Sequence, residues 1–202
     1  MKIALVPVSA KPYHAGHHAL VTMAAAENDI VKLFVSTSDR KRKGQFPILG
    51  SDMEKIWKQE LEPIMPGNVQ IEYGGSPVRK VYEALGNADQ DPSNEDTLVV
   101  YSDPTDTAQN YPEKNLEKYC PTLRASGQCV LAAEESPESF TRGAGTPNVS
   151  GTAVREMLRD GDFASFSAAM PPGVNAQNIF NILTQNVQSE KLLRKYIQTI
   201  LG

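Results

Sequence analysis

The sequence predicts an α/β protein: a doubly wound, five-stranded parallel sheet followed by a C-terminal helical extension. One observation behind this prediction is that short apolar runs alternate with segments whose apolar residues recur at helical spacing, the pattern of β–α–β units. The other is the length, since 202 residues suit one such domain and can bury a sizeable core. We expect residues 1–160 to form the α/β domain and residues 161–202 to form the extension, packed on the same domain.

Five strands are expected, each a short run rich in apolar and β-branched residues. The first is the most distinct, because its continuous apolar run is followed by a proline. In chain order the expected strands are Ile3–Val6, Val31–Ser36, Val69–Tyr73, Thr97–Tyr101 and Cys129–Ala133. Because helical segments alternate with them, the strands should run parallel.

The expected helices are Gly16–Glu27, Ser51–Leu61, Pro77–Leu85 and Ser150–Arg159. Ser51 suits the N-cap of the second helix, Pro77 suits the first turn of the third, and Trp57 is expected in the core. Between the second strand and the second helix, Thr37–Gly50 is expected to be a polar, basic loop. Past Ala176, an apolar stripe at helical spacing is more typical of a docking or dimer surface than of a functional motif. Its members are Ile179, Phe180, Leu183, Val187, Leu192, Leu193, Tyr196 and Ile200.

Composition narrows the class of protein. A hydrophobic content of 40%, a charged content of 22% and a net charge of −4 are typical of a globular protein and give no reason to expect a surface for duplex nucleic acid. No apolar run approaches the ~20 residues that cross a bilayer, and no signal sequence is evident, so a cytoplasmic location without a membrane partner is expected. Cys120 and Cys129 lack metal-ligand or C-x-x-C spacing and are expected to be reduced thiols.

All three histidines of the chain lie at the junction of the first expected strand and helix: His14, His17 and His18. In an open parallel sheet, ligands bind at the carboxyl ends of the strands near the point where the strand order reverses. Gly16 removes a side chain where the helix begins, which lets a phosphate approach the backbone. Imidazoles can donate to phosphate oxygens and, when protonated, can neutralise the charge on a leaving pyrophosphate. Lys11 can reach the same phosphates.

Two other interpretations of the histidine cluster stay open. The cluster could bind a metal, although zinc would need further Cys, Asp or Glu ligands at a matched spacing, and none is evident. The histidines could also be ordinary residues that cluster by chance. This applies most readily to His18, which can simply project from the helix.

A second polar motif begins the last helix expected before the extension, at Val149-Ser150-Gly151-Thr152-Ala153-Val154-Arg155. The hydroxyls of Ser150 and Thr152 are placed to cap a helix N-terminus, where free N–H groups attract an anion. Arg155 lies one turn further on, and its guanidinium can bind two phosphate oxygens. Alone, this motif is an ordinary helix start, but together with the histidines it predicts the other half of a phosphate site.

The two motifs resemble the signatures of the nucleotidyltransferase superfamily, which shares its fold with class I aminoacyl-tRNA synthetases. His14-Ala15-Gly16-His17 is similar to H-x-G-H, and Val149 to Arg155 is similar to I-S-x-T-x-x-R. The preceding Pro12-Tyr13 and the stretch from Gly161 to Val174 resemble archaeal-type nicotinamide mononucleotide adenylyltransferases. The whole chain also looks like the cytidylyltransferase-like proteins of large tailed phages, which would place it in the host cytoplasm. The resemblance implies a Rossmann-like nucleotidyltransferase fold.

The resemblance further implies a reaction. An acceptor phosphate would attack the α-phosphorus of a nucleoside triphosphate, and pyrophosphate would leave. His17 would hold the α- and β-phosphates and His14 the β- and γ-phosphates, with Ser150, Thr152 and Arg155 closing the other side. Mg²⁺ would be bound through the nucleotide phosphates, without a dedicated metal site in the protein.

Three features bear on the substrates. Asp103, expected just after the fourth strand, would contact the nucleoside, although a plain turn explains it equally well. The basic stretch Arg40 to Lys43 could cover the phosphates or the acceptor, or simply be solvated. The glycine-rich stretch Thr141–Gly145 resembles a lid, and an ordinary surface loop would look the same.

Alternatives for the reaction remain. ATP with nicotinamide mononucleotide is favoured, and a CTP-dependent transferase with a phosphorylated alcohol comes second. Pro7 to Lys11 departs from the usual Gly-x-Phe opening, which puts the acceptor in doubt more than the chemistry. A third candidate is a non-catalytic nucleotide-binding or virion component that keeps the fold. The apolar tail leaves a homo-oligomer open.

Overall fold

A computed structural model describes residues 1–141, 143 and 145–185. Its sheet has five strands, all parallel, in the order β3-β2-β1-β4-β5. The strands are β1 (Lys2–Val8), β2 (Ile30–Val35), β3 (Val69–Tyr73), β4 (Thr97–Val100) and β5 (Cys129–Leu131). The predicted α/β class with a doubly wound parallel sheet is therefore confirmed, and each expected strand is present to within two residues at either end.

The chain winds outward from the centre of the sheet twice. It builds β1, β2 and β3 towards one edge, and then returns to place β4 on the free side of β1, with β5 beyond it. The order of the strands therefore reverses between β1 and β4. At such a reversal the crossover connections leave on opposite sides, and a crevice opens at the carboxyl ends of the strands.

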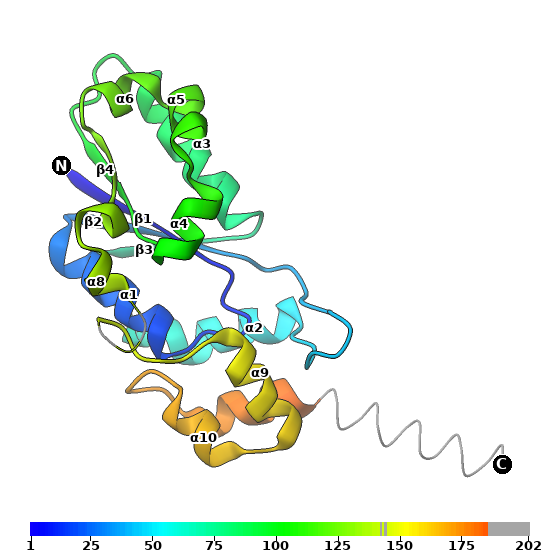
Figure 1. The fold of residues 1–202 in the computed structure, drawn as a ribbon. Coiled ribbons are helices and arrows are strands. Elements are labelled where there is room, and N and C mark those ends of the chain that lie inside the picture. The colour runs from blue at the N-terminus through cyan, green and yellow to red at the C-terminus, as the bar shows by residue number, and fades with distance from the viewer. Residues whose placement is uncertain (142, 144, 186–202) are drawn as a thin grey trace, which may run out of the picture.

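Helices cover both faces of the sheet, and β1 supplies alternate residues to each side. Ala4, Val6 and Val8 belong to one apolar core, whereas Ile3 and Leu5 belong to a second one. In Figure 1, α3, α4, α5 and α6 group on one side of the strands, and α1, α2, α9 and α10 lie on the other. Burial on both faces explains why a central strand such as β4 is continuously apolar, whereas the edge strand β3 alternates apolar and exposed polar residues.

The helices are α1 (Ala15–Glu27), α2 (Gly50–Ile56), a π-helical turn (Trp57–Leu61), a short 3₁₀ turn (Glu62–Ile64), α3 (Pro77–Asp89), α4 (Pro104–Asn110), α5 (Glu113–Tyr119), α6 (Pro121–Ala125), α7 (Ala132–Glu135), α8 (Pro137–Phe140), α9 (Gly151–Asp160) and α10 (Phe163–Ala168). Residues 176–185 are also helical. Trp57 is buried as expected. Cys120 and Cys129 are free and buried, with their sulfur atoms 3.8 Å apart.

Three expectations about the elements are wrong. The second helix starts at Gly50 with Leu49 at its N-cap, so Ser51 is not the cap. Instead, the carboxylate of Asp39 accepts from the N–H of Gly50 at 2.8 Å. The last strand stops at Leu131, because Ala132 already begins α7. The helices α4, α5 and α6 were not expected at all.

The residues after α9 contribute to the main core. Phe166 and Ile179 are buried in the same apolar cluster as Val6, on β1. In addition, the carbonyl of Ala169 accepts from the N–H of Ala15, at the start of α1, at 2.9 Å. The extension therefore supports the turn that carries the histidines. Of the apolar stripe in the tail, Val187 and the residues beyond it lie outside the described residues. Within the described part, no helix is long and apolar enough to cross a membrane.

Candidate functional site

A pocket lies at the reversal point of the sheet. Its floor is the end of β1, at Pro7, Val8 and Ser9, and one wall is the segment after β4, at Ser102 and Asp103. The opposite wall is the start of α1, and the segment before α9 closes the top. The pocket therefore occupies the crevice that this sheet topology provides for ligands.

His14 and His17 form a reciprocal cap at the N-terminus of α1. His14 is the N-cap residue, and its Nδ1 accepts from the N–H of Gly16 at 3.2 Å. The Nδ1 of His17 accepts from the N–H of His14 at 3.3 Å. A ring nitrogen that accepts a hydrogen bond carries no proton, so the proton of each neutral ring is on Nε2. Both histidines are thereby set as Nε2–H donors.

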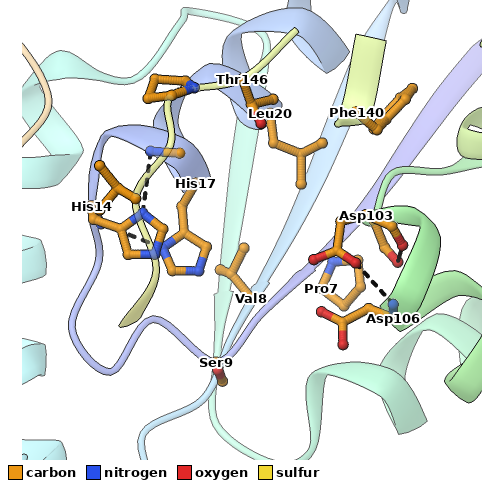
Figure 2. A pocket seen from close by; sticks show the side chains of 14 residues that line it. Pro7, Val8, Ser9, His14, His17, Leu20, Asp103, Asp106, Phe140 and Thr146 are labelled. Atoms are coloured by element: carbon orange, nitrogen blue, oxygen red, sulfur yellow. Dashed lines mark hydrogen bonds between the residues drawn. The ribbon is translucent and has the colours of Figure 1, made fainter. Parts of the chain in front are cut away.

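The two imidazoles also stack on each other. Their ring centroids are 3.9 Å apart and their planes are 27° from parallel. Figure 2 shows the stacked rings on one side of the pocket, with Asp103 and Asp106 on the other. Two donors at a helix N-terminus, where the backbone dipole is positive, suit the binding of a phosphate chain.

A side chain at Gly16 would make one tight contact and one ordinary contact. A Cβ built on it would lie 3.1 Å from the ring of His14 and 3.6 Å from the carbonyl oxygen of Val149. The first distance is tighter than side chains normally tolerate, so an added methyl group would push the cap of His14 aside. Glycine here therefore lets α1 begin directly against the segment that precedes α9.

Asp103 is the N-cap of α4, where its carboxylate accepts from the N–H of Asp106 at 2.9 Å. Both carboxylates line the pocket with the histidines. Asp103 thus lies at the site where a nucleoside contact was expected. Its capping bond also fits the plain-turn interpretation. Asp106 was not expected, because its place depends on α4, whose formation was missed.

The second motif lies where α9 begins. Ser150 is its N-cap and accepts from the N–H of Ala153 at 3.1 Å, as expected. The guanidinium of Arg155 donates to the carbonyl of Lys11 at 2.7 Å and to the hydroxyl of Thr152 at 2.8 Å. Sequence positions 144 residues apart are thereby joined directly. The motif thus meets the loop before α1, but Ser150, Thr152 and Arg155 do not line the histidine pocket.

The charged form of Arg155 is disfavoured in this position by burial and by neighbouring positive charges. Its pKa is lowered to about 10, mainly by burial and also by the nearby charges of Arg40 and Arg42. The guanidinium is still charged at neutral pH. Its Nε is buried without a hydrogen-bond partner among the described residues. A cluster of like charges with an unsatisfied donor is stabilised when an anion binds beside it.

Lys11 is placed in a second, adjoining pocket rather than in the first. Its ammonium is buried and donates to the carbonyl of Ser36 at 2.9 Å. Burial lowers the pKa of Lys11, and the charge of Asp39 opposes that shift. This second pocket is lined by Ser9, Lys11, Ser36, Ser38, Asp39, Arg40, Lys41 and Arg42. Ser9 lines both pockets, so they meet at the end of β1.

The structure thus defines an α/β protein with a double histidine cap at the reversal point of its sheet and a cationic pocket beside it. No protein-family model matches the chain, and no curated protein is significantly similar to it. Among the described residues, no three His, Cys, Asp or Glu side chains converge where they could hold a metal ion. In the expected lid, Gly143 has a positive φ of 81°, and Arg142 and Ala144 lie outside the described residues.

Proposed function

We propose that this protein is a nucleotidyltransferase that transfers a nucleoside monophosphate from ATP or CTP to a phosphorylated small molecule and releases pyrophosphate. The observation that carries the proposal is the pair of Nε2–H donors, fixed by a reciprocal cap at the N-terminus of α1 and facing the crevice at the reversal point of the sheet. A triphosphate matches this arrangement, because it is a long anion with acceptor oxygens at regular intervals.

The adjoining cationic pocket would bind the second substrate, the acceptor. A transfer reaction needs two anionic ligands held close together, and the two pockets meet at Ser9. With Lys11, Arg40 and Arg42 around it, the second pocket fits the phosphate of an acceptor. Asp103 and Asp106, across from the histidines, fit hydroxyl groups of the nucleoside. Adenylyl transfer from ATP to nicotinamide mononucleotide is the favoured reaction, and cytidylyl transfer is the alternative.

In the proposed reaction, a phosphate oxygen of the acceptor attacks the α-phosphorus of the triphosphate. The new bond forms as the bond from the α-phosphorus to its bridging oxygen breaks, and the electrons of that bond leave with pyrophosphate. No protein nucleophile is needed, because the acceptor phosphate is already ionised. The protein contributes position and charge. The Nε2–H groups of His14 and His17 stabilise the negative charge that grows on the leaving phosphates.

Mg²⁺ fits this site through oxygen ligands alone. It keeps several waters and binds phosphates with one or two carboxylates, and Asp103 and Asp106 are the carboxylates that line the pocket. When bound, it would neutralise phosphate charge. The nucleotide phosphates would be its main ligands.

A nucleotide-binding protein without transfer activity is the second candidate. The observation in its favour is that Arg155 and Lys11 donate to backbone carbonyls, which is a structural use of both side chains. Such a protein would bind the triphosphate through the histidines and release nothing.

The two candidates separate in a pyrophosphate-release assay with ATP or CTP and a panel of phosphorylated acceptors. We expect release with at least one pair, and a loss on the order of 10²–10³ in rate for His17→Ala. Thr22→Ala, on the exposed side of the same helix, is the matched control and should keep the wild-type rate. Nucleotide binding without release for any pair would reject the transferase in favour of the binding protein.

A further inference from the structure

The ring of Tyr13 connects the histidine pair to the core. Tyr13 immediately precedes the N-cap of α1, and only 2% of it is exposed. On one side its ring stacks on His17, with centroids 5.4 Å apart and planes 21° from parallel. The ring of Tyr13 also packs edge-on against the indole of Trp57, with ring centroids 4.9 Å apart. Tyr13 therefore spans the space between a candidate phosphate ligand and a buried core residue.

His17 is consequently flanked by two rings, Tyr13 at 21° and His14 at 27° to its plane. This matters because the second side-chain torsion of histidine is broad and weakly restricted by its own rotamer preferences. The hydrogen bond at Nδ1 fixes one atom of the ring, at a length of 3.3 Å that marks a weak bond. Two nearly parallel ring neighbours restrict the remaining rotation, and so help to determine where Nε2 points.

The support behind Tyr13 is rigid. Trp57 is 1% exposed and begins the π-helical turn Trp57–Leu61, and it also contacts the ring of Tyr73. Turns of this kind are rare and are frequent near functional sites. A buried indole has few rotamers open to it, because its neighbours are closely packed. Packing against the core, more than the conformation of its own loop, therefore fixes the position of Tyr13.

The hydroxyl of Tyr13 makes only a weak contact. Its oxygen is 3.5 Å from Nδ1 of His18, at the limit of a hydrogen bond. Burial lowers the pKa of His18 and raises the pKa of Tyr13, so both are neutral near pH 7. His18 is therefore a neighbour of the stack and not a charged ligand. The ring of Tyr13, more than its hydroxyl, is the feature in contact with His17.

We infer that Tyr13 is a positioning residue for His17: its ring holds the imidazole plane so that Nε2–H meets the phosphate chain. The structural part of this inference stands by itself, and its effect on rate rests on the proposed function. A phenylalanine at this position should serve as well as the tyrosine, whereas a leucine of comparable burial should not.

The test compares Tyr13→Phe with Tyr13→Leu by long-range ¹H–¹⁵N NMR, in which the three histidines give few, separable signals. We expect Tyr13→Phe to keep the ring-current shift and the Nε2–H tautomer pattern of His17. Tyr13→Leu should lose the ring-current shift and move the nitrogen signals towards a mixture of tautomers. It should also weaken the change that ATP causes at the Nε2 of His17. Tyr82→Leu removes a ring on α3 that contacts two other tyrosines and does not line the pocket, and it controls for a general loss of packing.

Turnover provides the second readout. For Tyr13→Leu, we expect kcat to fall between about ten- and a hundredfold with little change in KM, because misplacement of one catalytic group costs that much. Tyr13→Phe should keep the wild-type kcat. A folded Tyr13→Leu protein with the wild-type signals of His17 would overturn the inference, and so would a Tyr13→Phe protein as impaired as Tyr13→Leu. If the wild-type protein transfers nothing, the proposed function fails, and the NMR comparison still decides the role of Tyr13.

Discussion

At the scale of single residues, the histidines do two things at once. His14 caps α1 through Nδ1, and this same bond places the proton of its neutral ring on Nε2. The structural and the proposed chemical roles can therefore be separated by substitution. Other short polar residues also cap a helix, but they have no second ring nitrogen with which to donate.

The first prediction uses this separation. His14→Ala should lower the free energy of unfolding by about 1 kcal/mol, because the cap is lost. His14→Asn should retain that stability, since asparagine is among the best N-caps. Both variants should lose on the order of 10²–10³ in rate, because the donor is gone. Denaturant unfolding and pyrophosphate release measure the two effects. A His14→Asn protein with wild-type turnover would show that His14 is a cap alone.

Lys11 leads to a prediction about pH. Burial lowers its pKa below the usual value, so its ammonium loses its proton earlier than a lysine in water would. The charged form attracts anions, and affinity should therefore be present at neutral pH and decline as pH rises through the lowered pKa. Because a phosphate anion only gains negative charge as pH rises, a decline in affinity at alkaline pH is due to the protein.

The measurement is calorimetric binding of inorganic pyrophosphate from neutral to alkaline pH. The wild type should lose affinity with rising pH, and Lys11→Gln should start roughly tenfold weaker and depend less on pH. Arg155 is present in both proteins, so the difference between them isolates Lys11. Identical pH profiles would contradict the assignment of Lys11 to the anion site.

At the scale of elements, the sheet was predictable because each strand is a short run rich in apolar and β-branched residues, continuous in β4 and alternating with exposed polar residues in the edge strand β3. The helices between β4 and β5 were not. Each is seven residues or shorter, which is too short for apolar residues to recur visibly at helical spacing. Each also starts next to a proline, at Pro104, Pro112 and Pro121, and in the sequence these prolines indicate turns. The cap of α2 comes from Asp39, eleven residues before Gly50, which local spacing cannot reveal.

Helix α9 depends on Arg155 for its attachment to the loop before α1. The guanidinium spans two acceptors, Lys11 and Thr152, and a lysine ammonium cannot reach both in the same fixed geometry. Arg155→Lys should therefore lower the free energy of unfolding by about 1–3 kcal/mol, since a buried acceptor loses its partner. It should also weaken triphosphate binding.

Arg159→Lys is the matched control on the same helix. Arg159 is exposed and bonded to Asp160 beside it, so its replacement should change stability little. Urea unfolding of the two variants decides the matter. Equal stabilities would mean that the bridge between α9 and Lys11 contributes nothing to the fold.

At the scale of the whole molecule, the sequence predicted that residues from both ends of the chain would share one region, and the contact between Arg155 and Lys11 brings them together. It did not predict two pockets. The second pocket depends on how the loop after β2 folds back over Lys11, and the first depends on α4 for Asp106. Both are tertiary arrangements that no local pattern encodes. The overall arrangement, two pockets that meet at Ser9, is the basis on which we propose transfer between two phosphorylated substrates.

The most direct test of the proposed transfer follows the fate of a ³²P label in the nucleoside triphosphate. The protein is incubated with an acceptor and with ATP or CTP labelled with ³²P at either the α- or the γ-phosphate. Transfer as proposed should place the α-label in the acceptor product and the γ-label in pyrophosphate, and His17→Ala should slow both by a factor on the order of 10²–10³. Appearance of the γ-label as orthophosphate or on the acceptor would show that a different bond breaks, and would contradict nucleotidyl transfer.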